Sequence, residues 1–292
     1  MTNDLPITAE NKKGPGAKQL ALALLKSVVF FILAIYACDP FIYLIYPYFP
    51  SPFTQFFGYL LWSLFLLWIF SRFIEKRTMA DYGLGAKSIW AAVLEFYDGS
   101  LIGSLMVTTV TLILAVLGCY QALAIMPDYQ FLAIVPGLLA AALFEEVVFR
   151  GYVLQTIERA STTKMAVIVS SLLFGAAHLS NFHANEPLLT RLSSVTSLGL
   201  DAGLLFAAAY LYTRRLWLPA GLHAFWNIFE GPVFGTPVSG LHLGPPLILS
   251  SLSGPEVLTG GVFGPEASIV ELVVCLTLAW VIWQKGKIRN AS

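Results

Sequence analysis

The sequence predicts an all-α fold, a polytopic transmembrane helix bundle of about eight helices with its N and C termini in the cytoplasm. Three observations lead to this prediction. Hydrophobic residues make up 57% of the 292 residues and charged residues only 12%, whereas soluble domains average about 25% charged residues. Apolar runs about as long as a membrane-spanning helix recur along the chain. Basic residues cluster at alternate ends of these runs, as the positive-inside rule requires of cytoplasmic loops.

The chain divides into a polar tail, residues 1–19, expected to be disordered and cytoplasmic, and a single transmembrane domain, residues 20–292. The apolar runs of this domain are, in order, Leu20–Ala37, Phe53–Phe70, Leu101–Leu117, Phe131–Leu154, Met165–Leu179, Val195–Tyr212, Trp217–Phe229 and Ser268–Trp283. The seventh run is too short to cross a bilayer comfortably. We expect it to be a tilted or partly buried helix that protein surrounds.

The loops between the runs fix the expected topology. Lys and Arg precede the first run and follow the even-numbered runs, while the intervening loops hold almost none apart from Arg191. We expect no strands, because a membrane barrel would show alternating segments of about ten residues. The loop Glu230–Pro265 is rich in Gly and Pro and falls on the predicted outer side, where we expect it to fold back over the bundle as a lid.

Charge and cysteine content exclude several other classes of protein. The formal net charge is +0, so the electrostatic footprint of a nucleic-acid-binding protein is absent and we expect no DNA or RNA partner. Cys38, Cys119 and Cys275 lie far apart in the sequence. An odd count without paired spacing argues against a disulfide framework or a zinc cluster.

The fourth run contains Phe-Glu-Glu-Val-Val-Phe-Arg-Gly at residues 144–151. Charges inside a membrane-length segment are expensive and tend to mark function. On a helix, Glu146 and Arg150 are four residues apart and face each other as an ion pair, while Glu145 points about 100° away. We therefore expect Glu146 and Arg150 to form a structural ion pair and Glu145 to be the working carboxylate.

Other polar residues interrupt later runs. His178 lies in the fifth run, and His223 and Asn227 are four apart on one helical face of the seventh. If these runs converge, a glutamate in a buried, water-filled pocket can act as a general base toward water, and His178 can position that water or carry its proton. His223 and Asn227 can donate hydrogen bonds to the oxyanion that develops when water attacks a peptide carbonyl.

The three motifs Glu145-Glu146-x-x-x-Arg150, Phe174-x-x-x-His178 and His223-x-x-x-Asn227 resemble the signature of the CAAX-protease and bacteriocin-processing family (CPBP), also called the Abi family. The resemblance covers about residues 131–227, and the loop 258–266 is similar to that of bacterial members. It implies a glutamate-dependent intramembrane endopeptidase, so that residues 20–292 form one protease domain. In it Glu145 and His178 activate the water, His223 and Asn227 stabilise the oxyanion, and Glu146 and Arg150 hold the first motif in shape.

The resemblance also implies a peptide or membrane-anchored protein as substrate. Eukaryotic members remove the last three residues of prenylated proteins, whereas bacterial members are tied to bacteriocin maturation or immunity. Glu and His side chains can bind zinc, but the zinc-protease sequence His-Glu-x-x-His is absent. We therefore expect no cofactor. With no organelle-targeting signal in the sequence, a bacterial plasma membrane is the expected location.

Two alternatives from other classes stay open at the level of sequence. A proton- or ion-coupled transporter could use the same buried polar cluster as a relay. A non-catalytic membrane scaffold or immunity-type protein would keep Glu146 and Arg150 for stability but tolerate changes at Glu145 and His178.

Overall fold

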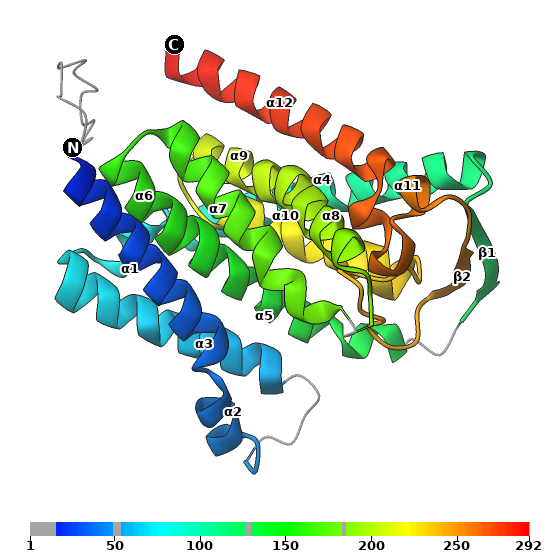
Figure 1. Ribbon diagram of the computed structural model, residues 1–292, viewed down its shortest axis with the longest axis horizontal. Coiled ribbons are helices and arrows are strands. Elements are labelled where there is room, and N and C mark those ends of the chain that lie inside the picture. The colour runs from blue at the N-terminus through cyan, green and yellow to red at the C-terminus, as the bar shows by residue number, and fades with distance from the viewer. Residues whose placement is uncertain (1–15, 49–53, 127–129, 183–184, 292) are drawn as a thin grey trace.

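The computed structural model describes residues 16–48, 54–126, 130–182 and 185–291, which form an elongated helix bundle with a two-stranded sheet at one end (Figure 1). Seven helical segments within these residues are long and apolar enough to cross a membrane, namely Ala17–Leu44, Thr54–Glu75, Ile89–Val116, Phe131–Ala160, Thr163–Asn181, Leu188–Thr213 and Ile269–Gly286. The predicted all-α membrane bundle is confirmed. The expected tail, residues 1–19, lies mostly outside the described residues.

The helices follow the predicted order of apolar runs. They are α1 (Ala17–Tyr36), α2 (Asp39–Ile45), α3 (Thr54–Ile69), α4 (Ile89–Val116), α5 (Val135–Glu146), α6 (Gln155–Ala160), α7 (Thr163–Ala177), α8 (Leu188–Leu198), α9 (Leu204–Thr213), α10 (Trp217–Ile228), α11 (Glu256–Thr259) and α12 (Ile269–Ala291). Two π-helical turns, Val147–Leu154 and Gly199–Gly203, join α5 to α6 and α8 to α9. The turn Val147–Leu154 is buried at every residue and belongs to the main hydrophobic core.

The third apolar run was predicted too short. Helix α4 begins at Ile89 rather than Leu101, because the Ser88 side chain caps it by accepting a hydrogen bond of 3.1 Å from the backbone N–H of Ala91. An N-cap serine satisfies one of the unpaired N–H groups of the first helical turn. The charged residues after Ile89 therefore lie on the helix instead of in the preceding loop.

The prediction of no strands was wrong in one place. Strand β1 (Tyr120–Ile125) pairs antiparallel with β2 (Ile248–Leu252), with Tyr120 opposite Leu252. Both strands lie in connections between helices, where the backbone N–H and C=O groups have no helical partners. Pairing the two connections satisfies these groups, and it ties the loop after α10 to the end of α4.

Helix α10 is the short seventh run, and the expectation that protein surrounds it is confirmed. Nine of its residues are buried, and it packs closely along α4. The two backbones approach so closely that a Cβ atom built on Gly103 would lie 2.3 Å from the carbonyl oxygen of Leu222, and one on Gly221 would lie 2.0 Å from that of Phe96. Glycine at these positions lets α10 lie against α4. This contact fixes where the residues that follow Leu222 lie in the bundle.

The ends of the helices that carry basic residues meet at one end of the bundle, which we call the basic end. The ion pairs there are Lys26–Glu75, Arg159–Glu75, Arg214–Glu158 and Arg215–Glu95. Helix α10 starts beside Arg215 and runs away from this end, and α12 returns to it. Because α10 crosses the bundle as the seventh run and α12 as the eighth, the first and last helices have their outer ends on the same side (Figure 1), as the sequence predicts.

Candidate active site

The first motif lies where α5 passes into a π-helical turn. Glu145 and Glu146 are the last two residues of α5, and Arg150 lies in the turn that follows. π-Helical segments often occur at functional sites. The guanidinium of Arg150 lies beside the carboxylate of Glu146, one turn earlier in the chain.

The predicted ion pair between Glu146 and Arg150 is present and fully buried. Arg150 Nη1 lies 2.8 Å from Glu146 Oε1, and both side chains have 0% exposure. The other end of the guanidinium donates to the carbonyl oxygens of Gly203 at 3.1 Å and Ala202 at 3.5 Å, in the second π-helical turn. The rings of Phe174 and Phe206 lie 4.6 Å and 5.0 Å from the Arg150 guanidinium carbon. Arg150 therefore joins three elements of the bundle at one point.

The second carboxylate faces two histidines. Glu145 Oε2 lies 3.9 Å from His178 Nε2 and 3.8 Å from His223 Nε2, and its side chain is 20% exposed. The sequence-based hypothesis required these side chains to meet within about one helix diameter, roughly 10 Å. They meet well within it. The two separations exceed a direct hydrogen bond, and polar contacts of this length commonly accommodate a bridging water.

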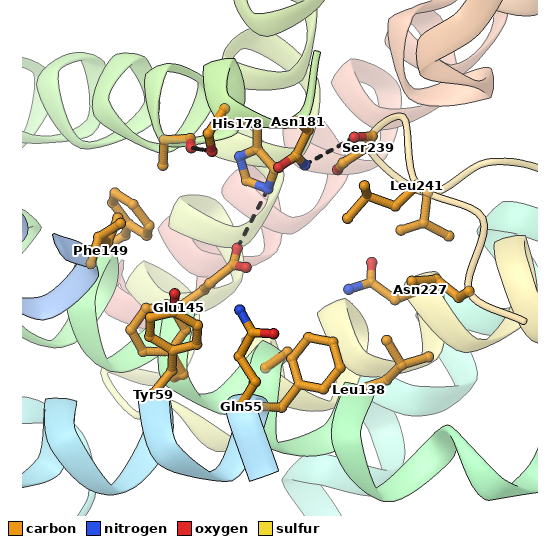
Figure 2. Close-up of a pocket in the computed structure, with 18 residues that line it drawn as sticks. Gln55, Tyr59, Leu138, Glu145, Phe149, His178, Asn181, Asn227, Ser239 and Leu241 are labelled. Carbon is orange, nitrogen blue, oxygen red and sulfur yellow. Dashed lines mark hydrogen bonds and ion pairs between the residues drawn. The ribbon is translucent and has the colours of Figure 1, made fainter. Parts of the chain in front are cut away.

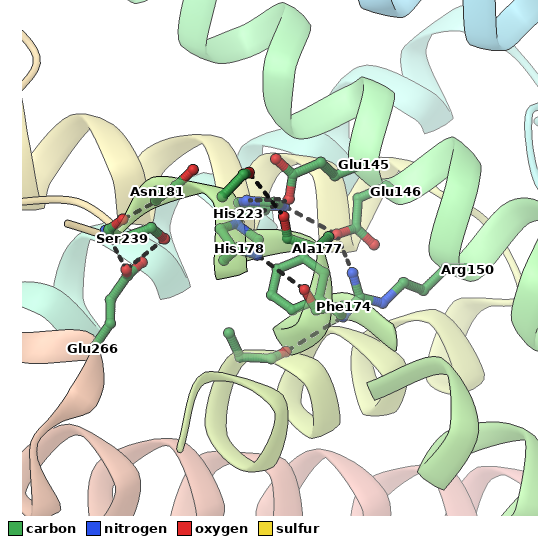
Figure 3. A network of polar contacts seen from close by, with 12 residues as sticks. Glu145, Glu146, Arg150, Phe174, Ala177, His178, Asn181, His223, Ser239 and Glu266 are labelled. Carbon is green, nitrogen blue, oxygen red and sulfur yellow. Dashed lines mark hydrogen bonds and ion pairs between the residues drawn. The ribbon is translucent and has the colours of Figure 1, made fainter. Parts of the chain in front are cut away.

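Hydrogen bonds at Nδ1 orient both imidazoles. Nδ1 of His178 lies 2.9 Å from the carbonyl oxygen of Phe174, and because a carbonyl only accepts, Nδ1 carries the proton. Nδ1 of His223 lies 3.0 Å from Glu146 Oε1 in the same way. In each histidine Nε2 is left facing Glu145 (Figure 3). Nε2 accepts a hydrogen bond when the imidazole is neutral and donates one when it is doubly protonated.

A cavity of about 280 Å³ opens onto this cluster, and Glu145, His178 and Asn227 are among its lining residues. The Asn227 side chain points into the cavity from the wall opposite His178 (Figure 2). No protein group within the described ranges hydrogen-bonds to its amide, which is therefore available to a ligand. His223 does not line the cavity. It is 5% exposed and lies behind Glu145, next to Glu146.

The lid expected from Glu230–Pro265 folds back as predicted, and Val238, Ser239, Leu241 and Leu243 line the cavity. A network that the sequence did not predict holds this segment in place. The carboxylate of Glu266 accepts hydrogen bonds from the backbone N–H and, at 2.7 Å, from the hydroxyl of Ser239. The amide of Asn181 donates to the Ser239 carbonyl at 2.9 Å (Figure 3). The one sequence feature that could have indicated this network is the glutamate that directly follows Gly264-Pro265.

Glu266 belongs to a group of buried acids beside the site. Asp201, Glu230, Glu266 and Glu271 are all 3% exposed or less, and the pKa of Glu266 is raised by burial while its hydrogen bonds from Ser239 oppose that shift. Burying charges without cationic partners is costly.

In the part of the chain that the structure describes, no group of three or more His, Cys, Asp or Glu side chains is placed to hold a metal ion. The expectation of no cofactor stays a prediction.

Residues 127–229 match the family model described as "Type II CAAX prenyl endopeptidase Rce1-like". This region contains the whole set of motif residues, from Glu145 to Asn227. No curated protein and no solved structure matches the chain significantly. The match and the motifs agree: the resemblance to the CAAX-protease and bacteriocin-processing family is confirmed, and it supports a multi-pass, CAAX-type intramembrane endopeptidase.

Proposed function

We propose that the chain hydrolyses a peptide bond inside the membrane with a water molecule that Glu145 and His178 activate. The observation that carries the proposal is the approach of His178 Nε2 to Glu145 Oε2 at 3.9 Å, on the wall of a cavity that reaches the protein surface. A water placed between them would hydrogen-bond to both groups. Glu145 takes its proton as the water attacks the carbonyl carbon, and no covalent enzyme intermediate is needed.

His223 and Asn227 stabilise the oxyanion of the tetrahedral intermediate in this proposal. Asn227 reaches the cavity directly and supplies a neutral N–H donor. His223 holds a proton on Nδ1 against Glu146, so Nε2 donates only when the ring carries a second proton. Donors fixed before the reaction begins lower the barrier because they need no reorganisation.

Glu146 and Arg150 act as positioning residues. Glu146 Oε1 accepts from both Arg150 Nη1 and His223 Nδ1, so one oxygen atom connects the ion pair to the imidazole. Removing either member leaves a buried charge without its partner, and removing Glu146 also frees the His223 ring to rotate. Activity and folding are therefore coupled at this point of the bundle.

The substrate is a peptide or a membrane-anchored protein, and the enzyme works without a cofactor in this account. The cavity supports such a substrate because apolar residues, among them Leu138, Phe144 and Phe149, line it together with the few polar groups that the chemistry needs. A pocket of this kind binds an apolar chain and orients it through a small number of hydrogen bonds. We place the protein in a bacterial plasma membrane.

The proposal is tested with purified protein in liposomes and a panel of membrane-anchored peptides, one of them prenylated. Wild type should cleave at least one peptide with or without a chelator, and Glu145→Gln should cleave none. Loss of wild-type cleavage on chelation would bring a metal into the mechanism. Proton or ion flux that depends on Glu145, without cleavage of any peptide, would favour the transporter. Equal function of wild type and Glu145→Gln in a cellular assay would favour the scaffold.

A further inference from the structure

The catalytic cavity lies far from the basic end. Gln55 lines the cavity near the start of the span Thr54–Glu75, whose other end carries Glu75 of the ion-pair network. That span is 22 residues long, or roughly 33 Å at the helical rise. His178 and Ser180 line the cavity near the end of the span Thr163–Asn181, which begins at the basic end. The cavity therefore belongs to the half of the bundle remote from the basic end.

The mouth of the cavity also faces the remote end. Its exposed lining residues are Gln55, Ser180 and Leu241, which come from the start of α3, the end of the α7 span and the lid segment. A second cavity of about 500 Å³ shares Asn181 with the first and continues between the lid segment and β2. Its lining includes Glu186 and His242, and it offers a polar space beside the mouth.

The interior between the site and the basic end is closed. Fully buried side chains fill it, each with 0% exposure: Tyr82, Tyr152, Leu154, Ile157 and Leu216. Beyond them lie the ion pairs of the basic end, such as Arg214–Glu158 at 2.7 Å. A peptide approaching from the basic end would have to displace both layers, whereas a peptide approaching from the remote end meets an open cavity.

Basic residues mark the cytoplasmic side of a membrane protein. We propose that the scissile peptide enters from the extracytoplasmic face, so that the substrate class is the outward-facing segment of a membrane-anchored protein and not a cytoplasmic C-terminal peptide. This inference rests on the proposed peptidase function for its substrate, but the side on which the cavity opens is a property of the fold alone.

Cysteine labelling tests the side of access without any need for activity. Ser180→Cys and Lys164→Cys place single reporters at opposite ends of the same span, and both positions are exposed. The native cysteines Cys38, Cys119 and Cys275 are buried, so wild type measures the background. In intact bacterial cells expressing the chain, a membrane-impermeant maleimide should label Ser180→Cys and leave Lys164→Cys unlabelled. After permeabilisation both should react.

Labelling of Lys164→Cys alone in intact cells would overturn the proposal, as would labelling of both variants, which indicates mixed orientation. Failure of Ser180→Cys to react even in permeabilised cells would show that the mouth of the cavity is closed, and this result would also overturn the proposal. A second arm uses two reporter proteins that carry one cleavable peptide on either side of the same membrane anchor. Only the outward reporter should be cleaved, and cleavage of the inward reporter contradicts the substrate class. If neither reporter is cleaved, the peptidase function fails while the labelling still decides the side of access.

Discussion

Replacing Gly103 by alanine should disturb the site from a distance. The added Cβ would lie 2.3 Å from the carbonyl oxygen of Leu222 and 3.1 Å from the backbone nitrogen of Trp226. Both contacts involve helix backbone, which cannot rotate away as a flexible side chain can. An ordinary contact begins near 3.4 Å, so α10 must move from α4 by about 1 Å at this point. Leu222 directly precedes His223, and the imidazole would move with it.

The expected cost follows from that displacement. Overpacking a tight contact costs about 1–3 kcal/mol of folding free energy. A misplacement of about 1 Å in a catalytic group can lower the rate by roughly 10²-fold. Thermal unfolding in detergent should therefore show a lower midpoint for Gly103→Ala, and cleavage should be slowed by more than the loss of folded protein explains.

Gly286→Ala is the matched control. Gly286 is also a helical glycine, on α12, but a Cβ there would meet only Tyr212 Cδ2 at 3.7 Å. Alanine in place of a helical glycine is usually stabilising by about 0.5–1 kcal/mol, so this variant should keep or raise the unfolding midpoint. If Gly103→Ala and Gly286→Ala unfolded alike and cleaved alike, the reasoning that α4 sets the position of His223 would be refuted.

Three further predictions concern charged groups. Arg150→Ala leaves Glu146 buried without its partner and should lower the free energy of unfolding by about 3–5 kcal/mol, measured by denaturation in detergent; a change under about 1 kcal/mol would contradict the buried pair. Because burial raises the pKa of Glu266, this group stabilises the fold below the usual glutamate pKa, and the contribution is lost as the pH rises through the pKa of Glu266 in the folded protein. The unfolding midpoint of wild type should therefore rise from pH 7 to pH 5, and Glu266→Gln should show a smaller rise. An equal pH dependence of the midpoint in the two proteins would contradict this role of Glu266. Lys26→Ala breaks the partly exposed pair with Glu75 and should cost less than about 1 kcal/mol, with the small difference vanishing at high salt; a larger, salt-independent loss would show that the pair is not screened.

The helices and their order could be predicted because a membrane imposes a simple rule on sequence. A spanning helix needs a long apolar run, and basic residues report the side of each loop. The pairing of Glu146 with Arg150 followed from helical spacing alone, since i and i+4 side chains face each other. The short run Trp217–Phe229 was correctly expected to be surrounded by protein.

Other features depend on contacts between distant segments and leave little trace in a single sequence. Arg150, in one π-helical turn, bonds to the carbonyls of Ala202 and Gly203 in another, 52 and 53 residues away. The pairing of β1 with β2 joins connections that are separated in the chain by helices α5 to α10. The role of Glu266 depends on the position of Ser239, which nothing in the local sequence fixes.

The placement of His223 shows most clearly what helical spacing alone does not predict. Spacing put His223 and Asn227 on one helical face, but only Asn227 lines the cavity, while His223 lies behind Glu145 and bonds to Glu146. A helical face is wide enough to serve both a cavity and the packing behind it. Whether a residue on this face lines the cavity or packs behind it depends on how closely α10 lies against its neighbours. The contact with α4 fixes that position.

The most direct test of the account compares Glu145→Gln with Asp98→Asn in the peptide cleavage assay. Asp98 is an exposed carboxylate on α4 that takes no part in the site, so its change to the amide controls for loss of charge. Both variants should unfold at the wild-type temperature. Glu145→Gln should lose cleavage by roughly 10²–10⁴-fold, the usual contribution of a general base, while Asp98→Asn cleaves at the wild-type rate. Cleavage by well-folded Glu145→Gln within a few-fold of wild type would contradict the central claim that Glu145 activates the water.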